Sequence, residues 1–221
     1  NGQLFLSFFK GYDVVKQTLT PDERTRIEGN FLLELYLDTR GLSKRVNNKS
    51  GPGAASRVAV GIFYDDHEAL DEGLLHFHEI MESQFYEDGT WKETPIYGAK
   101  SMNEGMSEIP EMLLGRIDLY ADPLYRQAFK SYAELATPLD TQPAIGDSTA
   151  DFRLPPILVD IARIRLNLNM SYGPKSMKGF GVRSPGEMAA YSGYTPSLGC
   201  IATDDNRSGL DGTIGFGSVG H

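Results

Sequence analysis

Apolar residues recur every three or four positions through most of residues 20–170, a spacing typical of amphipathic helices. The clearest start signal is at Thr20, a residue that can cap a helix, which is followed by Pro21 and then by Glu23. One apolar stripe is predicted on the helix that begins there, formed by Ile27, Phe31, Leu32, Leu35 and Tyr36. The pattern therefore predicts a chain that is mainly helical over this part.

The same spacing predicts further helices over residues 53–64, 66–86, 104–120 and 155–170, and one that starts at Asp122-Pro123. Small residues in 53–64 permit close helix packing, and Pro110 is expected to kink its helix or to mark a late start. The helix after Asp122 is expected to turn Leu124, Ala128, Tyr132 and Leu135 inward. We expect antiparallel hairpins in a curved or closed α/α array, with the longest loops at one end.

The pattern changes after residue 172. Residues 198–203 and 212–216 have strand character and are separated by the turn-rich segment 204–209. A lone hairpin is not stable by itself. We therefore expect residues 173–221 to be the linker and first strands of an antiparallel β-sheet domain that is truncated in this chain. The first residue is not methionine, so the chain is expected to be a fragment or a processed piece, with its helical portion over residues 1–172.

Composition argues against several classes of function. The formal net charge is −9, whereas general nucleic-acid binding relies on a basic surface. The longest apolar runs, such as residues 4–9, are too short to span a bilayer, so no membrane partner is expected. The single cysteine, Cys200, cannot form an intramolecular disulfide and is expected to be a buried small hydrophobe.

Charge is nevertheless distributed unevenly along the chain. Residues 40–57 contain no acidic side chain and five basic ones: Arg40, Lys44, Arg45, Lys49 and Arg57. A local basic patch on an acidic protein can bind an anionic ligand, although a solvated loop would look the same in sequence.

Tyr97 lies between Pro95 and Gly98 in a predicted loop, which favours a fixed, exposed position. An ordinary tyrosine, with a pKa of about 10, is a poor acid or base at neutral pH. A nearby cation such as Lys49 or Lys92 would lower the pKa of Tyr97 and make proton transfer feasible. Simple packing of the ring is the alternative.

Other polar residues have both a structural and a functional interpretation. Asn47 and Asn48 are turn formers, and an amide can also donate hydrogen bonds to a carboxylate without adding a charge. Glu93 could orient its loop or simply be solvated. Residues 76 and 78 are histidines on different faces of one helix, which argues against a shared metal. Glycines just before His221 would let the backbone there approach a ligand.

Taken together, these segments resemble the heparinase II/III-like polysaccharide lyases, a family that includes alginate and heparan lyases and is related to uronyl epimerases. The resemblance follows the chain in order and covers nearly all of it. The matching segments are Gly11-Tyr12-Asp13-Val14-Val15, Leu19 to Arg24, Asn47-Asn48, Asp88 to Tyr97, and Gly212 to His221.

The resemblance implies an incomplete α/α toroid followed by antiparallel β-sheet, with an anionic polysaccharide or oligosaccharide in the cleft between them. It implies β-elimination of a 4-linked uronate, in which the carboxylate is neutralised, the C5 proton is removed and the glycosidic oxygen leaves with a proton. Asn48 matches the neutralising asparagine, Tyr97 the catalytic tyrosine and His221 the histidine of the sheet domain. The residues expected to bind substrate are Arg45, Asn47, Lys49, Trp91 and Glu93.

One position departs from the family pattern. Many relatives have a histidine that acts as base directly after the asparagine, where this chain has Lys49. Some relatives lack that histidine and leave both proton transfers to the tyrosine. Lys49 could bind carboxylate or sulfate, or it could act as the base. The departure weakens an assignment to the alginate-specific or epimerase branches.

The sequence therefore predicts a polysaccharide lyase. The alternatives are a uronyl C5-epimerase, a non-catalytic carbohydrate-binding or scaffold fragment, and a toroidal glycoside hydrolase, which would need two carboxylates across a cleft. No cofactor is expected, with zinc in the sheet domain left open. A periplasmic or secreted location is expected although no signal peptide is visible, and the oligomeric state is left open.

Overall fold

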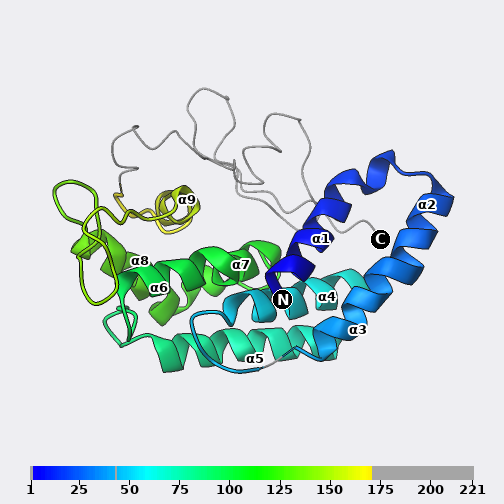
Figure 1. Cartoon of the computed structure of the whole chain (residues 1–221), viewed down its shortest axis with the longest axis horizontal. Helices are drawn as coiled ribbons and strands as arrows, with labels where there is room; N and C mark the ends of the chain where they lie inside the picture. The colour runs from blue at the N-terminus through cyan, green and yellow to red at the C-terminus, as the bar shows by residue number, and fades with distance from the viewer. Residues whose placement is uncertain (1, 43, 171–221) are drawn as a thin grey trace.

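The computed structural model describes residues 2–42 and 44–170, and this part of the chain is built from helices (Figure 1). Within these residues no strand forms, and the only β-type pairing is a single bridge between Phe85 and Trp91. The prediction of a mainly helical chain is thus confirmed for the described part. The predicted hairpin of residues 198–216, Cys200 and His221 lie outside it. The α-helices are α1 (Gly2–Val15), α2 (Pro21–Arg26), α3 (Leu33–Arg40), α4 (Gly51–Tyr64), α5 (His67–Gln84), α6 (Pro95–Ser101), α7 (Glu108–Met112), α8 (Pro123–Leu135) and α9 (Pro156–Ile164).

The start signal at Thr20 operates as the sequence predicts. The Thr20 hydroxyl accepts a hydrogen bond from the Glu23 N–H, and the Glu23 carboxylate accepts one from the Thr20 N–H, so the capping box is complete. α2 continues through the π-helical turn η2 (Ile27–Leu32) into α3. Leu32 and Leu35 are buried, whereas Phe31 is 46% exposed and meets Phe8 edge-on. The stripe is therefore narrower than predicted.

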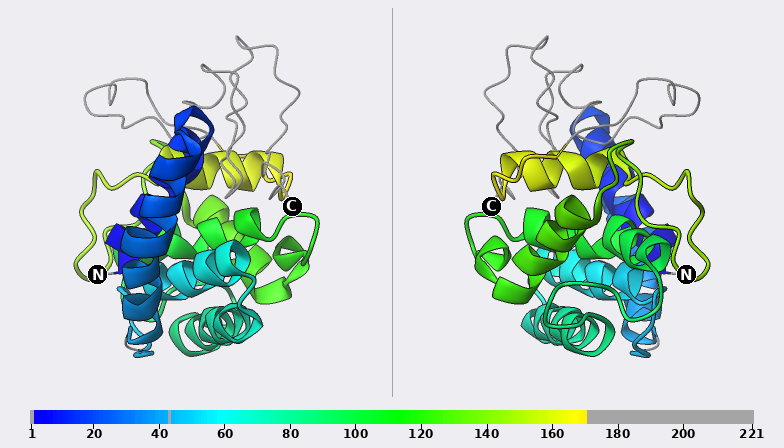
Figure 2. Two further views of the ribbon diagram at one scale, coloured as in Figure 1. Left: turned by 90° about the vertical axis from the view of Figure 1, so that its right-hand side faces the viewer. Right: turned by 90° about the vertical axis from the view of Figure 1, so that its left-hand side faces the viewer.

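α4 is the central helix of the molecule, and α5 packs antiparallel to it (Figures 1 and 2). Small residues allow the two backbones to approach closely. A Cβ atom at Gly61 would lie 2.7 Å from Leu70 Cβ, and one at Gly73 would lie 2.7 Å from Val58 Cγ2. The close packing predicted from small residues in α4 is confirmed.

The predicted helix over residues 104–120 is confirmed only in part: α7 lies within that range, but it ends at Met112, before Gly115 with its φ of +81°. Helical structure instead begins at Pro95, where Thr94 caps α6, and continues through the π-helical turn η3 (Met102–Met106) into α7, which ends at Met112. The break falls at Gly105, which has a φ of +141°, an angle that glycine adopts readily and other residues rarely do. A Cβ atom there would lie 2.3 Å from the carbonyl carbon of Gly51, so the close contact with α4 also requires glycine.

The remaining helices complete one side of the molecule. Asp122 caps α8 by accepting a hydrogen bond from the Tyr125 N–H at 2.8 Å, as its sequence predicts. Leu135 is exposed rather than inward-facing. α9 packs against α8 and the turn η3, on the side of the molecule that carries α6 to α8 (Figure 1). It ends at Ile164, not near residue 170, and Asn167, just beyond it, adopts a left-handed φ of 53°. Among the described helices, none combines the length and apolarity needed to cross a membrane.

Candidate functional site

Residues 45–50 form a tight turn just before α4, and this turn carries four of the predicted site residues: Arg45, Asn47, Asn48 and Lys49. The Asn47 side-chain oxygen accepts a hydrogen bond from the Lys49 N–H at 2.8 Å, and the Asn47 N–H donates to the Ser50 hydroxyl at 2.9 Å. Asn47 therefore acts as a turn former, the structural alternative considered for it. Asn48 is half-buried and Lys49 is exposed at the tip.

The turn lies at the same end of the helical array as the helix that carries Tyr97. α4 and α5 form an antiparallel pair, so the chain returns after α5 to the end where α4 began. The first residue of α4 then packs against the end of α6, since a Cβ atom at Gly51 would lie 3.0 Å from the Ser101 carbonyl oxygen. Ser101 is about one helical turn beyond Tyr97.

Tyr97 is half-buried within α6 and does not lie in a loop. Its hydroxyl donates a hydrogen bond to the Asp147 carboxylate at 3.1 Å. This hydrogen bond and the negative charge of Asp147 raise the pKa of Tyr97 above its ordinary value. The expectation that a lysine lowers the pKa of Tyr97 is therefore wrong. The Lys92 ammonium group instead donates to the Ser83 carbonyl oxygen at 2.6 Å.

Trp91 and Glu93 form a structural pair on the segment that leads into α6. The Trp91 ring is 6% exposed and meets Phe85 edge-on, while its indole N–H donates to the Glu93 carboxylate at 3.1 Å. A Cβ atom at Gly98 would lie 2.6 Å from Trp91 Cβ, so the residue packs directly against α6. The Trp91 ring thus packs against the helix of Tyr97, and its expected contact with substrate stays a prediction.

Asp147 is the neighbour of Tyr97 that sequence reasoning missed. It lies on the loop before α9, fifty positions along the chain from Tyr97. The next residue, Ser148, is buried and its hydroxyl accepts a hydrogen bond from the Ile96 N–H at 3.1 Å, which docks the loop on the first turn of α6. The Gly146-Asp147 pair was available as a turn signal, but nothing local indicated its partner.

A cavity of about 310 Å³ lies elsewhere, beside the loop after α8. None of the predicted site residues lines it. Its charged residues are Asp140 and Arg153, and the Arg153 guanidinium donates to the carbonyl oxygens of Leu139 and Asp140 at 2.6 and 3.3 Å. The guanidinium thus has a structural task in holding that loop, and we place more weight on the Asn48 and Tyr97 region despite the size of the cavity.

Arg45 is exposed at the start of the turn, and its carbonyl oxygen accepts a hydrogen bond from the Ser50 hydroxyl. His221 lies outside the described residues. Over residues 2–42 and 44–170, no three histidine, cysteine, aspartate or glutamate side chains are grouped so as to hold a metal ion. No family model, curated protein or solved structure matches this chain, so its function must be argued from its residues and their geometry.

Proposed function

We propose that the chain is a polysaccharide lyase of the heparinase II/III-like type, acting on a uronate-containing anionic glycan by β-elimination. The observation that carries the proposal is the packing of the start of α4 on α6, which brings the Asn48 turn and the helix of Tyr97 to one end of the helical array. In this proposal the helical hairpins belong to an α/α toroid, and residues 173–221 lead into an antiparallel β-sheet domain.

The proposed reaction assigns Asn48 to the substrate carboxylate. Its amide N–H groups would donate hydrogen bonds to the carboxylate as negative charge grows there, which lowers the barrier to removing the C5 proton. A base takes that proton, the C4–C5 double bond forms from the C5–H electron pair, and the C4–O bond breaks. The leaving glycosidic oxygen receives a proton from Tyr97.

Tyr97 is assigned the acid step because a phenol carries its proton at neutral pH even at its ordinary pKa of about 10. The hydrogen bond to Asp147, which raises the pKa of Tyr97, opposes the phenolate that the base step would need. The base is then Lys49 or His221, and the two remain alternatives. Arg45 and Lys49 are both exposed on the turn, where their charges favour an anionic substrate.

The test is incubation of the chain with a panel of uronans, including alginate and heparan sulfate, while the absorbance of unsaturated products is recorded. Production of unsaturated ends supports the lyase. Solvent deuterium incorporation at C5 without chain cleavage would favour the epimerase instead. Binding of a uronan by the folded chain with neither reaction would favour the non-catalytic alternative.

Variants then test the individual roles. Tyr97→Phe keeps the ring but removes the proton donor, so kcat should fall about 100-fold or more with little change in KM. Asn48→Ala should cost roughly 2.7 to 4 kcal/mol of transition-state stabilisation. Tyr86→Phe is the matched control, because Tyr86 is an exposed tyrosine on the turn after α5. Full activity of Tyr97→Phe would rule out the proposed acid.

A further inference from the structure

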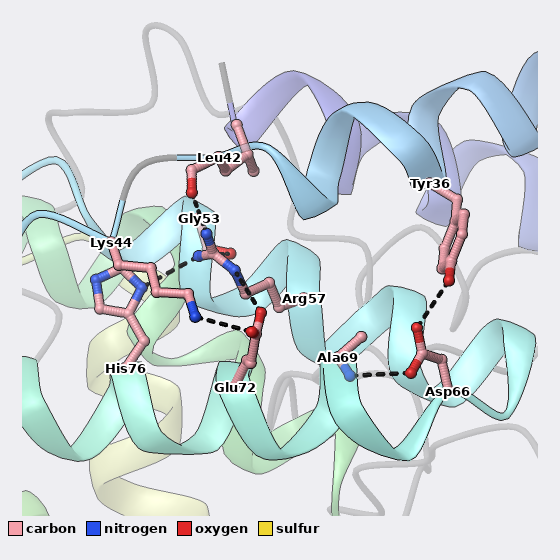
Figure 3. Close-up of polar contacts among 9 residues, drawn as sticks. All are labelled: Tyr36, Leu42, Lys44, Gly53, Arg57, Asp66, Ala69, Glu72 and His76. Atoms are coloured by element: carbon pink, nitrogen blue, oxygen red, sulfur yellow. Dashed lines mark hydrogen bonds and ion pairs between the residues drawn. The ribbon is translucent and has the colours of Figure 1, made fainter.

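Arg57 is the largest fully buried side chain of the described residues, and it lies on the central helix α4 (Figure 3). Its Nη2 donates to the carbonyl oxygen of Leu42, in the segment that follows α3. Its Nη1 lies 3.3 Å from His76 Nδ1 on α5 and 3.4 Å from the Gly53 carbonyl oxygen. One buried guanidinium therefore connects α4, α5 and the segment leading to the Asn48 turn.

The contacts of His76 determine which of its nitrogens carries a proton. A guanidinium has only donors, so Nδ1 must accept from Arg57. The other ring nitrogen, Nε2, lies 3.1 Å from the Arg45 carbonyl oxygen, which can only accept, so Nε2 must donate. His76 is 1% exposed and thus serves both neighbours as a neutral ring with its proton on Nε2.

The Arg45 carbonyl oxygen links this ring to the turn. It accepts hydrogen bonds from both His76 Nε2 and the Ser50 hydroxyl, and that hydroxyl in turn accepts from the Asn47 N–H at 2.9 Å. A movement of the His76 ring would therefore displace the residues on either side of Asn48.

The charges around His76 oppose its protonation on balance. Burial lowers the pKa of His76, and the positive charges of Arg57 and Lys44 act in the same direction. The Arg45 carbonyl oxygen and Glu79 act in the opposite direction. Glu72 lies beside the cluster, 3.8 Å from Arg57 Nε and 2.8 Å from Lys44 Nζ, and so balances those two cations. A proton on Nδ1 would face a guanidinium that has no acceptor to offer it.

From these contacts we infer that His76, held by Arg57, is the positioning residue of the turn that presents Asn48 and Lys49, and that it positions the turn only as the neutral ring. Acidification then releases the turn. The catalytic meaning of this device rests on the proposed function, but the device itself can be tested without any substrate.

The first experiment measures tryptic cleavage at the turn, after Arg45 and Lys49, in the folded 221-residue chain. His76→Ala should raise the cleavage rate about five- to tenfold, as expected from the loss of the hydrogen bond between His76 and the Arg45 carbonyl oxygen of the turn. His76→Gln should restore the slow rate, because an amide can donate to the Arg45 carbonyl oxygen and accept from Arg57. His67→Gln is the matched control, since His67 is exposed at the start of the same helix. Equal cleavage in wild type and His76→Ala would overturn the inference.

The second experiment tests the neutral ring. Nitrogen chemical shifts of the histidine rings, with His76 identified by its absence in His76→Gln, should show a proton on Nε2 alone at neutral pH. Amide exchange over residues 45–50, corrected for intrinsic rates, should accelerate as pH falls below about 6.5 in the wild type but not in His76→Gln. A protonated His76 at neutral pH, or the same acceleration in both proteins, would contradict the inference.

The activity measurement separates this device from the proposed function. If the lyase proposal holds, His76→Ala should lower kcat more than it raises KM, and His76→Gln should recover kcat and flatten the acid side of the pH profile. If the turn responds in the cleavage and exchange experiments while Tyr97→Phe keeps full activity, the lyase mechanism fails and the positioning role stands. If the turn does not respond, the positioning role fails regardless of activity.

Discussion

Two arginines brace distant segments of this molecule, and their partners differ in kind. Arg57 is met by two backbone carbonyl oxygens and a neutral imidazole, with the Glu72 carboxylate 3.8 Å away. Arg165, just after α9, instead makes two hydrogen bonds to the Glu111 carboxylate on α7, at 3.0 and 3.1 Å. The hydroxyl of Tyr120 also donates to this carboxylate. The first brace relies on polar neutral groups, and the second on opposite charges.

The kind of partner determines the cost of removing each arginine. When one partner of a buried ion pair is removed, the other is left as an uncompensated charge, which is costly. When Arg57 is removed, Glu72 keeps its ion pair with Lys44, so the groups left without a partner are neutral dipoles, and these cost less. The Arg165 brace should therefore lose more stability on truncation, although the Arg57 brace is closer to the candidate site.

The largest expected effect is that of Arg165→Met. Glu111 is 3% exposed and would be left without its counter-charge, so the free energy of unfolding should fall by about 3 to 5 kcal/mol in urea denaturation. The double variant Glu111→Leu with Arg165→Met should recover much of this loss. Arg116→Met is the control, since Arg116 is exposed. If the double variant is less stable than the single one, the charge argument is wrong.

Arg57→Met should have a smaller effect on the same measurement, about 1 to 3 kcal/mol, because it leaves buried acceptors without a donor. Arg57→Lys should rescue it poorly, since an ammonium group cannot reproduce the fork that reaches Leu42, Gly53 and His76 together. A loss greater than that of Arg165→Met would reverse the comparison between the braces.

The two braces should also respond to pH with opposite signs. Burial lowers the pKa of His76 below 6.5, so the unfolded chain binds the proton more readily, and stability should decrease as pH falls from about 6.5 through the folded pKa. Burial raises the pKa of Glu111 above 4.5, so its contribution is present below about pH 4.5 and is lost as pH rises through the folded pKa. Urea denaturation over a pH series should show that His76→Gln removes the first trend and Glu111→Gln the second. Parallel curves for wild type and both variants would refute the assignment.

The smallest effect is expected at the edge of the Arg57 brace. Lys44 is 53% exposed and pairs with Glu72 at 2.8 Å, so Lys44→Ala should cost about 0.2 to 1 kcal/mol and less in high salt. Thermal denaturation at low and high ionic strength is the measurement. A loss that does not depend on salt would mean that Lys44 contributes by packing.

Local sequence signals predicted the helices well where the stabilising contact is made between residues close together in the chain or across one helix pair. The caps at Thr20 and Asp122 and the small residues of α4 all have their effects within one or two turns or across one helix pair. The start of α6 was missed, although Thr94-Pro95 is a cap followed by a proline at the first helical position. The helical period over residues 104–120 was misleading because the chain breaks at Gly105, where a distant backbone approaches, and because α7 ends at Met112, before Gly115 with its φ of +81°.

The candidate site was predictable only in outline. Asn48 and Tyr97 were selected by sequence, and the hairpin between them explains why they lie at one end of the array. Asp147, which raises the pKa of Tyr97, lies fifty positions along the chain and has no local signature. Trp91 looked like a ligand-binding aromatic, but its place against Phe85 and α6 depends on the docking of three segments.

The helical class and the capped starts of α2 and α8 follow from the sequence alone, because caps and helical periods depend on residues that are near one another along the chain. Which charged groups are buried, and what they meet, follows only from the folded structure. In sequence Arg57 is one of five basic residues in the stretch 40–57, yet it is fully buried. Its acceptors come from segments before, within and after its own helix, and only folding brings them together.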